Sequence, residues 1–403
     1  MSTCNLEDLF KGGVVLVKGL PGSGKTLLVA KAVSQFKKAA WFTFYETEDR
    51  LRKYLSSVGV NPPAYIFDLI SVGGREAASL IVERVLQLKP DAVVIDGVNA
   101  ISGEAERELL HAIFYHGLSR EVPVVLVKEG TEVTAADYIA DVILELEHRV
   151  YESGASIRFL KIVKSRGRPQ QYVTFPLVIT ERGPVVITPI EKSREPPSER
   201  LTTGAPEIDE ALGGGVWRGS LVAVVGPPDG LASKLMVLTA VELSRRGSKV
   251  LYHHHKVVPT FTKFAEALGV KWQRPNIHWY YHPVSEHKSL TWWFKSAQMV
   301  NEGEIDVHFA DQYEQVVSSV GVEPLVEAAR VYQTILKRPV TTVLVFNSYE
   351  AWDAASKHLG SIVDYVFRFE HGRLVANAPD FASPIEFEFE IDWEKRRVLY
   401  TRR

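Results

Sequence analysis

The chain has 403 residues, more than one ordinary hydrophobic core can serve, so its length predicts two domains of roughly 200 residues each. Its 47 basic residues nearly balance its 49 acidic residues, giving a formal net charge of −2, so no overall positive field recruits nucleic acid. The single cysteine, Cys4, excludes an internal disulfide, and no apolar run reaches the roughly 20 residues that span a bilayer. The composition therefore predicts a soluble, cytoplasmic protein without a membrane segment.

Apolar runs alternate with helical patterns through the first part of the chain. Expected helices begin near residues 25 and 49, and expected strands cover residues 14–18, 41–45, 91–96 and 122–127. Near-continuous apolar strands separated by helices are typical of a parallel sheet that is covered on both faces. Antiparallel strands at one edge are predicted by three more closely spaced runs, at residues 140–148, 155–167 and 170–179. Ligands of such sheets bind at the carboxyl ends of the parallel strands.

A glycine-rich stretch follows the first expected strand and opens the first expected helix. Its letters, GLPGSGKT, match the phosphate-binding pattern G-x-x-x-x-G-K-T. The glycines let backbone N–H groups turn toward phosphate oxygens at the positive end of the helix dipole. Lys25 supplies a cation for the β- and γ-phosphates, and the hydroxyl of Thr26 can bind Mg²⁺. The predicted ATP site is formed by Gly19, Leu20, Pro21, Gly22, Ser23, Gly24, Lys25 and Thr26.

Two acidic residues at strand ends complete the predicted site. Asp96 ends the strand at residues 91–96, where a carboxylate can hold Mg²⁺ through water. Glu46 follows the strand at residues 41–45 and is the candidate for orienting the attacking water, a role worth about 10²–10⁴-fold in rate. The alternative for Glu46 is a solvated acidic turn shared with Glu48 and Asp49. The sequence thus predicts hydrolysis of Mg-ATP as well as binding.

The second half of the chain repeats the first. Residues 217–256 contain an apolar strand, a glycine-containing turn, a helix and a second strand, in the same order as residues 10–47. The two copies predict a first domain at residues 1–190 and a second domain at residues 201–403. A polar, proline-containing stretch at residues 191–200 is the predicted linker.

A resemblance to the KaiC-like branch of the RecA superfamily of ATPases lies in the order of five phrases, GLPGSGKT, FTFYET, VVIDGVNAI, ADYIADVILELEH and KIVKSRG. The second half opens with RLTTGAPEIDEALGGGVWRGSLVAVVGPP, which is similar to the opening phrase of domains in that family. The resemblance covers nearly the whole chain and implies two tandem RecA-like P-loop domains. Each is expected to be an α/β domain whose mostly parallel sheet has flanking helices and antiparallel edge strands. The first domain lacks the opening phrase.

The same resemblance implies a role for two basic residues after the edge strand. In that family such residues reach across a subunit interface to the γ-phosphate bound by the neighbour, and by motif position they are Lys164 and Arg166. Residues i and i+2 of an extended strand point to the same face, which agrees with a shared target. An arginine finger contributes about 10³–10⁵ in rate, and hexameric rings or filaments would follow. The alternative is a solvated basic turn.

One departure from the family pattern lowers the expected activity. Members usually carry two adjacent glutamates at the tip of the second strand, whereas here the first of the two positions is Tyr45. A tyrosine cannot act as a base near neutral pH because its reference pKa is about 10. Glu46 remains as the only carboxylate of the pair, so we expect slow hydrolysis.

The second domain lacks most of the chemistry of the first. Its loop, GPPDGLAS at residues 226–233, has Ala232 in place of the lysine, with Asp229 and Leu231 in place of two glycines. Losing a charge-assisted contact costs about 1.5–3 kcal/mol, and Asp229 adds negative charge where phosphate would lie. Only Ser233 keeps the hydroxyl of Thr26. We therefore expect a second domain that does not hydrolyse ATP.

The rest of the second domain gives fewer signals. The strand tip that corresponds to Tyr45 and Glu46 reads His255 and Lys256, so no carboxylate base remains there. Asp311 matches the magnesium-holding position of the first domain. Without the loop lysine, it is expected to be a structural or interfacial acid.

Histidines and aromatic residues gather in the second domain. In the stretch YHHHK only His253 and His255 could share a metal ion, because consecutive residues of a strand alternate between faces. Trp292 and Trp293 lie near lysines and could stack on single-stranded bases, with core or interface packing as the alternative. A protein-partner surface in this region is a further alternative.

Together these patterns predict a slow, Mg-dependent ATPase that assembles into a homo-oligomer and couples its nucleotide state to assembly or to partner binding. The second domain is expected to be a scaffold or regulatory copy. Two alternatives stay open, a recombination accessory that binds single-stranded DNA and a nucleotide-sensing scaffold without turnover.

Overall fold

The computed structural model describes residues 9–10, 13–101, 122–166, 173–188, 198–256, 259–395 and 397–403. The chain divides into two compact units, which are called the first and second domains below. The first contains residues 1–150 and 156–188, and the second contains residues 151–155 and 189–403. Most of the expected linker at residues 191–200 lies outside the described residues. Within the described ranges, no helix is both long and apolar enough to cross a membrane.

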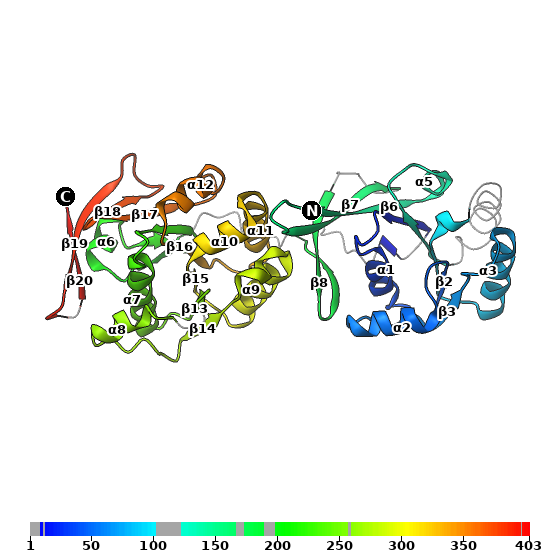
Figure 1. Cartoon of the computed structure of the whole chain (residues 1–403), viewed down its shortest axis with the longest axis horizontal. Coiled ribbons are helices and arrows are strands. Elements are labelled where there is room, and N and C mark those ends of the chain that lie inside the picture. The colour runs from blue at the N-terminus through cyan, green and yellow to red at the C-terminus, as the bar shows by residue number, and fades with distance from the viewer. Residues whose placement is uncertain are drawn as a thin grey trace. The chain divides into compact units, whose positions relative to one another are not determined.

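A nine-stranded sheet forms the centre of the first domain (Figure 1). Its strands lie in the order β3-β2-β4-β5-β1-β6-β7-β8-β9, with parallel pairs up to β6 and antiparallel pairs from β6 to β9. The expected parallel sheet with antiparallel strands at one edge is confirmed. The strands are β1 (Val14–Gly19), β2 (Ala39–Thr43), β3 (Tyr65–Asp68), β4 (Ala92–Asp96), β5 (Val124–Glu129), β6 (Val142–Val150), β7 (Ser156–Ser165), β8 (Val173–Thr180) and β9 (Gly183–Val186).

Both faces of this sheet are covered. Along β1, Val15 and Val17 belong to a core on one face, whereas Val14 and Leu16 belong to a core on the other. Burial on both faces explains why the central strands are almost continuously apolar. The helices of the first domain are α1 (Lys25–Val33), α2 (Glu48–Ser57), α3 (Gly74–Leu88), the 3₁₀ helix η2 (Val98–Ala100) and α5 (Ala135–Ile139). α1 and α2 contribute to the first core, and α3 and α5 to the second.

The second domain has a sheet with the same architecture. Its order, β14-β13-β15-β16-β12-β17-β18-β19-β20, matches the first sheet position by position, so the repeat seen in the sequence is a repeat of topology. The strands are β12 (Leu221–Val225), β13 (Val250–His254), β14 (Ile277–Tyr281), β15 (Val307–Ala310), β16 (Thr341–Phe346), β17 (Tyr365–Glu370), β18 (Arg373–Asn377), β19 (Ile385–Asp392) and β20 (Arg397–Arg402). A separate two-stranded sheet pairs β10 (Arg200–Leu201) with β11 (Val216–Trp217).

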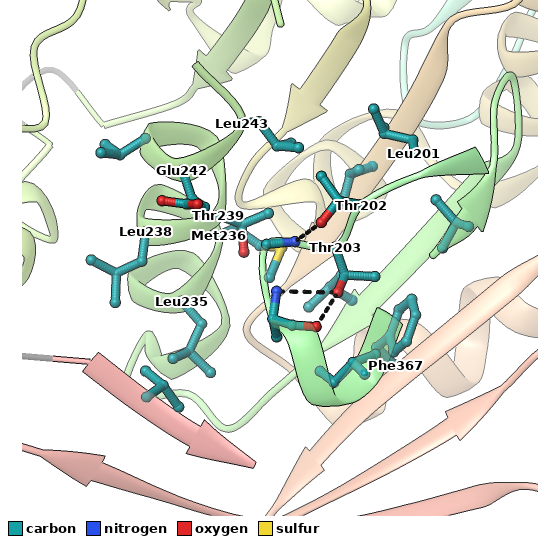
Figure 2. Close-up of a pocket in the computed structure, with 18 of the residues that line it drawn as sticks. Leu201, Thr202, Thr203, Leu235, Met236, Leu238, Thr239, Glu242, Leu243 and Phe367 are labelled. Carbon is teal, nitrogen blue, oxygen red and sulfur yellow. Dashed lines mark hydrogen bonds between the residues drawn. The ribbon is translucent and has the colours of Figure 1, made fainter. Parts of the chain in front are cut away.

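Helices cover the second sheet as well. They are α6 (Pro206–Ala211), α7 (Leu231–Arg245), α8 (Thr262–Ala267), the 3₁₀ helix η4 (Val284–Lys288), α9 (Leu290–Glu302), α10 (Tyr313–Val320), α11 (Val322–Ile335) and α12 (Tyr349–Leu359). α7 follows the central strand β12 in the same way that α1 follows β1. A cavity of about 370 Å³ lies between α7 and the segment at residues 201–208 (Figure 2).

Candidate functional site

The glycine-rich loop lies where the sequence predicts, between the end of β1 and the start of α1. Gly19 has φ +152°, and a Cβ on it would lie 2.3 Å from the backbone oxygen of Leu146, so only glycine fits. Gly24, with φ +102°, leads into the free N–H groups of the helix start. Ser23 Oγ is buried and has no hydrogen-bond partner within the described part of the chain. These donors suit a phosphate.

Lys25 is almost fully buried at the start of α1. Its Nζ donates a hydrogen bond to the backbone oxygen of Leu20 and pairs with Glu129 Oε2, each at 2.9 Å. Sequence reasoning missed Glu129, although one signal could have found it. Glu129 ends β5, the strand paired with the loop strand β1, and parallel strands bring their carboxyl ends together. A phosphate bound by the loop would compete with Glu129 for the lysine.

Asp96 and Thr26 lie side by side. Thr26 Oγ1 donates to Asp96 Oδ2 at 3.5 Å, and Asp96 is the last residue of β4. Burial raises the pKa of Asp96 to about 7, and the charge of Glu129 adds to the rise while Lys25 opposes it. Hydroxyl and carboxylate oxygens are ligands that Mg²⁺ accepts, and a divalent cation would favour the ionised carboxylate. The pair therefore fits the predicted magnesium position.

Tyr45 and Glu46 follow β2 but have different surroundings. The ring of Tyr45 covers Gly97, since a Cβ on Gly97 would lie 2.6 Å from that ring. Burial raises the pKa of Tyr45 above its usual value, and two neighbouring carboxylates add to the rise, so the phenol stays neutral. Glu46 Oε2 lies 3.2 Å from Arg50 Nε, and the Arg50 side chain is largely exposed whereas that of Glu46 is partly buried. Tyr45 thus lies beside Asp96, while Glu46 forms an ion pair with Arg50 of α2.

Lys164 and Arg166 lie away from the loop of their own domain. β7 runs antiparallel to β6, so Lys164 pairs with Ile143 near the start of β6, whereas the loop follows the end of β1. Lys164 Nζ donates to the backbone oxygen of Asp137 at 3.0 Å, and Arg166 pairs with Asp141 at 3.2 Å. The structure does not bring these cations together with Lys25.

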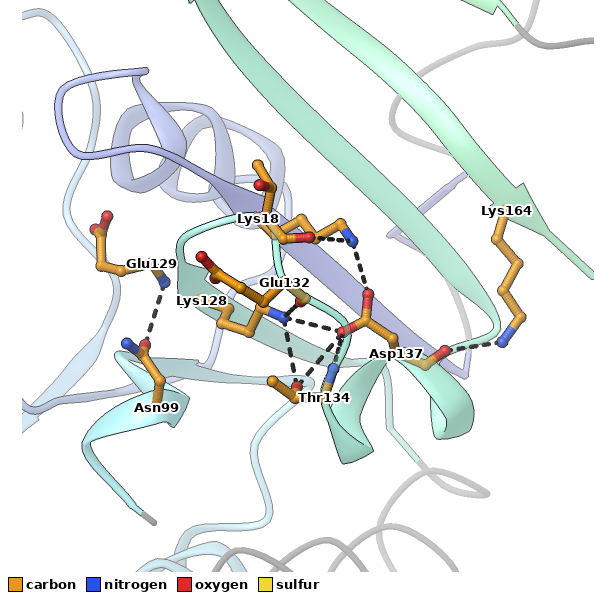
Figure 3. A network of polar contacts seen from close by, with 9 residues as sticks. Lys18, Asn99, Lys128, Glu129, Glu132, Thr134, Asp137 and Lys164 are labelled. Atoms are coloured by element: carbon orange, nitrogen blue, oxygen red, sulfur yellow. Dashed lines mark hydrogen bonds and ion pairs between the residues drawn. The ribbon is translucent and has the colours of Figure 1, made fainter.

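Two lysines are buried directly behind the loop. Lys18 of β1 and Lys128 of β5 are partners in register, and both pair with Asp137, at 2.8 and 2.9 Å (Figure 3). Burial acts to raise the pKa of Asp137, but hydrogen bonds from Lys18, Thr134 and Lys128 hold it below its usual value. Thr134 and Asp137 also form the capping box of α5. This cluster anchors the ends of β1 and β5, immediately before the loop and before Glu129.

The corresponding loop of the second domain is occupied by hydrogen bonds among its own side chains. Ser233 Oγ donates to Asp311 Oδ1 at 2.6 Å and accepts from Asn347 Nδ2 at 2.8 Å. The hydroxyl of Tyr252 donates to the other oxygen of Asp311 at 3.2 Å. Asp311 is fully buried, and this burial raises its pKa to about 7. Asp311 is therefore a structural hydrogen-bond centre, as the sequence suggested.

Strand pairing corrects one correspondence between the domains. The first residues of β2 and β4 pair with one another, as do those of β13 and β15. Counting from these pairs, Asp311 matches Asp96 and Lys256 matches Tyr45. From the sequence alone, His255 was matched to Tyr45, which is one residue too early. The connections before these strands differ in length between the two copies, so only the ladder gives the register.

The histidines and tryptophans of the second domain form a buried cluster. Ring nitrogens of His253 and His308 share a hydrogen bond of 2.7 Å, and the ring of His282 stacks on Trp292. Trp292 and Trp293 are only 5% and 8% exposed, which agrees with core packing rather than with stacking on bases. Burial lowers the pKa of His282 and of His308 to about 3. No group of three or more His, Cys, Asp or Glu side chains in the described ranges could hold a metal ion.

Comparison with known proteins finds similarity to a family of ATPases. Residues 5–192, which span the first domain, match the model of a family described as "ATPase: KaiC". The circadian clock protein KaiC2 of Synechocystis sp. (strain ATCC 27184 / PCC 6803 / Kazusa) is 24% identical over 286 residues, which are 61% of this chain and 50% of the relative. The circadian clock oscillator protein KaiC of Parathermosynechococcus lividus is 25% identical over 263 residues, 55% of this chain and 48% of the relative.

A shorter match involves a second kind of relative. The DNA repair protein RadA of Bacillus subtilis (strain 168) is 37% identical over 102 residues, which are 25% of this chain and 21% of the relative. The chain spans about half the length of the KaiC relatives it matches and less of RadA.

Proposed function

We propose, on the premise that the first domain belongs to the KaiC family of ATPase domains within the RecA superfamily, that this domain binds Mg-ATP and hydrolyses it slowly. One observation carries the proposal. Lys25 lies buried in an intact loop, next to the adjacent oxygens of Thr26 and Asp96. The second domain is a copy that does not hydrolyse ATP, because Ala232 replaces the lysine and Ser233 is bonded to Asp311.

The loop residues would bind the phosphates of ATP. Backbone N–H groups at the start of α1 and the unpaired Ser23 hydroxyl would donate to phosphate oxygens. Lys25 would turn its ammonium from Glu129 to the β- and γ-phosphates, which carry more negative charge. Mg²⁺ held by Thr26 and Asp96 would neutralise charge on the same phosphates.

Orientation of the attacking water is the step at which we expect the site to be slow. Tyr45 occupies the position beside Asp96 and stays protonated, so it cannot accept a proton from water. Glu46 is the predicted carboxylate for this role. Glu129 becomes a second candidate once Lys25 turns to phosphate, because its carboxylate then loses its partner inside the site. A missing or displaced base can reduce the rate by about 10²–10⁴-fold without weakening binding.

Lys164 and Arg166 are proposed to act on a neighbouring subunit. They lie near the start of β6 and contact α5, so they cannot serve the loop at the end of β1 in the same domain. In a homo-oligomer such as a hexameric ring or a filament, they would reach the γ-phosphate of the next copy. Turnover would then couple to assembly, which is the proposed purpose of the protein.

The first test is phosphate release from Mg-ATP by the whole chain at several protein concentrations. We expect Lys25→Ala to abolish release, while Lys234→Ala, the matched change at the start of α7, leaves it unchanged. Release per chain should rise with protein concentration if subunits complete one another's sites. Equal loss in both variants, or no loss in Lys25→Ala, would contradict the proposal.

A mixing experiment tests the action between subunits. Lys25→Ala chains lack the loop cation, and chains with Lys164→Ala and Arg166→Ala lack the residues proposed to act across the interface. Neither should turn over alone, but a mixture should recover part of the activity, because a loop from one can meet Lys164 and Arg166 from the other. A mixture as inactive as its components would place both defects in the same site.

A nucleotide-sensing scaffold is the second candidate, and Tyr45 over Gly97 is the observation that favours it. Under this alternative, ATP would bind with Lys25-dependent affinity and would remain unhydrolysed over hours. Equilibrium binding of radiolabelled ATP, followed by chromatography of the bound nucleotide, separates the two candidates. Recovery of ADP supports the ATPase, and recovery of intact ATP supports the scaffold.

A further inference from the structure

Protein interiors are close packed, with few voids larger than a water molecule. On the face of its sheet that α7 covers, the second domain instead has a cavity that is partly open to solvent. A cavity of about 370 Å³ lies between α7, the segment at residues 201–208 and the sheet. In Figure 2, α7 stands on one side of the cavity and the segment containing Thr202 and Thr203 crosses on the other. Its volume falls within the range of about 300–1,000 Å³ that is typical of small-molecule sites.

The walls and the rim of this cavity differ in character. The walls are mostly apolar, with Val224, Leu235, Met236, Phe367 and Tyr400 among them, and they come from α7 and six strands of the sheet. Of the lining residues that the structure describes, those classed as exposed are Pro206, Arg245, Arg246 and Arg397. Arg245 and Arg246 share the half-buried Glu242, and Glu207 is a second acid in the lining, so three arginines face two carboxylates. An apolar interior with an arginine-rich rim suits an amphipathic anion.

The strands that correspond to this part of the sheet make different contacts in the first domain. There, the edge hairpin of β8 and β9 packs against α1. A Cβ added to Gly24 would lie within about 4 Å of Leu177 and Ile179. Val186 packs on the hydrophobic core to which α1 contributes. In the second domain the last strand, β20, lies against α6 instead, and its residues Val398 and Tyr400 form part of the cavity wall. The matching hairpin thus packs against the helix after the loop in the first domain and lines the cavity in the second.

We infer that the second domain binds a medium-chain carboxylate in this cavity, with the hydrocarbon chain inside and the carboxylate at the arginine rim. An engineered cavity of about 150 Å³ holds one benzene, so the present volume suits an apolar body of up to roughly fifteen carbons. Arginine is suited to the head group because its fork of N–H donors matches a carboxylate. The inference concerns a site in the other domain and does not depend on ATP binding.

The test is isothermal titration calorimetry of the full chain with sodium decanoate, and with 1-decanol as the uncharged match. We expect one decanoate per chain with a dissociation constant on the order of 10 µM. Met236→Trp, which fills the cavity, should weaken binding by at least about ten-fold. The double variant Arg246→Gln and Arg397→Gln should weaken decanoate about ten-fold while leaving 1-decanol unchanged.

Two control variants locate the site. Arg373→Gln changes an exposed arginine on β18 that does not line the cavity, and Lys25→Ala changes the loop of the first domain, so neither should alter decanoate binding. If circular dichroism shows that Met236→Trp does not fold, the surface double variant and the alcohol still decide. Absence of binding up to about 1 mM, or equal affinity for acid and alcohol in the unmodified protein, would overturn the inference. So would a loss of binding in Lys25→Ala.

Discussion

The two domains share one strand order but not the charges around the loop that follows their central strand. Register along the strands identifies two replaced pairs of residues. Where the first domain has Lys25 and Glu129, the second has Ala232 and Asn347. Where the first has Lys18 and Lys128, the second has Val225 and Phe346. In each case both residues differ, which fits the high cost of leaving one buried charge without its counter-charge. The comparison teaches that the loop lysine belongs to a set of charges. In the second domain the whole set is replaced by apolar or neutral groups.

Acidification should produce the largest difference in stability between the two domains. Burial holds the pKa of His282, His287 and His308 at about 3, 2 and 3 in the folded second domain. The unfolded chain binds the same protons near pH 6.5, so stability is present above that pH and is lost as pH falls toward 3. Each histidine changes the free energy of unfolding by about 1.4 kcal/mol per pH unit in this window.

We therefore expect the second domain to unfold before the first on acidification, at about pH 4–5. Hydrogen exchange read by peptide mass spectrometry reports each domain separately. In the first domain, the lowered pKa of His148 comes from a histidine that is only partly buried, so its contribution is smaller. Simultaneous loss of protection in both domains would contradict the buried histidine cluster.

Removing the anion shared by the buried lysines should have the next largest effect. Asp137→Asn leaves Lys18 and Lys128 buried without a counter-charge, which we expect to destabilise the first domain by about 3–5 kcal/mol. Urea unfolding followed by domain-resolved hydrogen exchange measures the loss. Adding Lys18→Met should recover part of it, because one cation is then gone. Asp68→Asn, at an exposed position on β3, is the control and should change little.

Matched aspartates should show opposite consequences in the two domains. Asp96→Asn should reduce phosphate release by about 100-fold or more and leave the stability of the first domain nearly unchanged, because its main role is toward Mg-ATP. Asp311→Asn should leave phosphate release unchanged but cost about 1–3 kcal/mol in the second domain, since it disturbs three buried hydrogen bonds. A kinetic effect of Asp311→Asn would refute the division of roles.

Restoring a carboxylate at the strand tip should give the smallest effect. Tyr45→Glu places an acid beside Asp96, and we expect turnover to rise about ten-fold with unchanged ATP affinity. Lys256→Glu, at the matching position of the second domain, should leave turnover unchanged. Single-turnover phosphate release at saturating ATP measures both. No gain in Tyr45→Glu would mean that Glu46 or Glu129 already orients the water.

Much of the fold could be predicted because short apolar runs bounded by turns are distinctive. The runs that became β1, β4 and β5 were read from the sequence, and so was the loop at residues 19–26 between a strand and a helix. Asp96 was found in the same way, because a carboxylate that ends an apolar strand lies at the ligand edge. A local sequence pattern was enough to predict a site residue wherever that residue lies on one strand or in the turn that follows it.

The remaining site residues depend on which strands lie side by side. Lys18, Lys128 and Glu129 look like ordinary polar residues at strand ends, and only the pairing of β1 with β5 brings them together. The match between Tyr45 and Lys256 likewise required the ladder. The cavity of the second domain depends on where the hairpin of β19 and β20 packs, which no short pattern encodes.

The position of β1 at the centre of its sheet has a consequence for folding kinetics. Val15 pairs with Val125 on one side and with Val142 on the other, so both neighbours of the loop strand come from far along the chain. Contacts of such long sequence separation form slowly because loop-closure entropy must be overcome first. During synthesis, the loop that begins at Gly19 would wait until β6 has left the ribosome. Nucleotide binding would then act only on the completed domain and would slow its unfolding without speeding its folding.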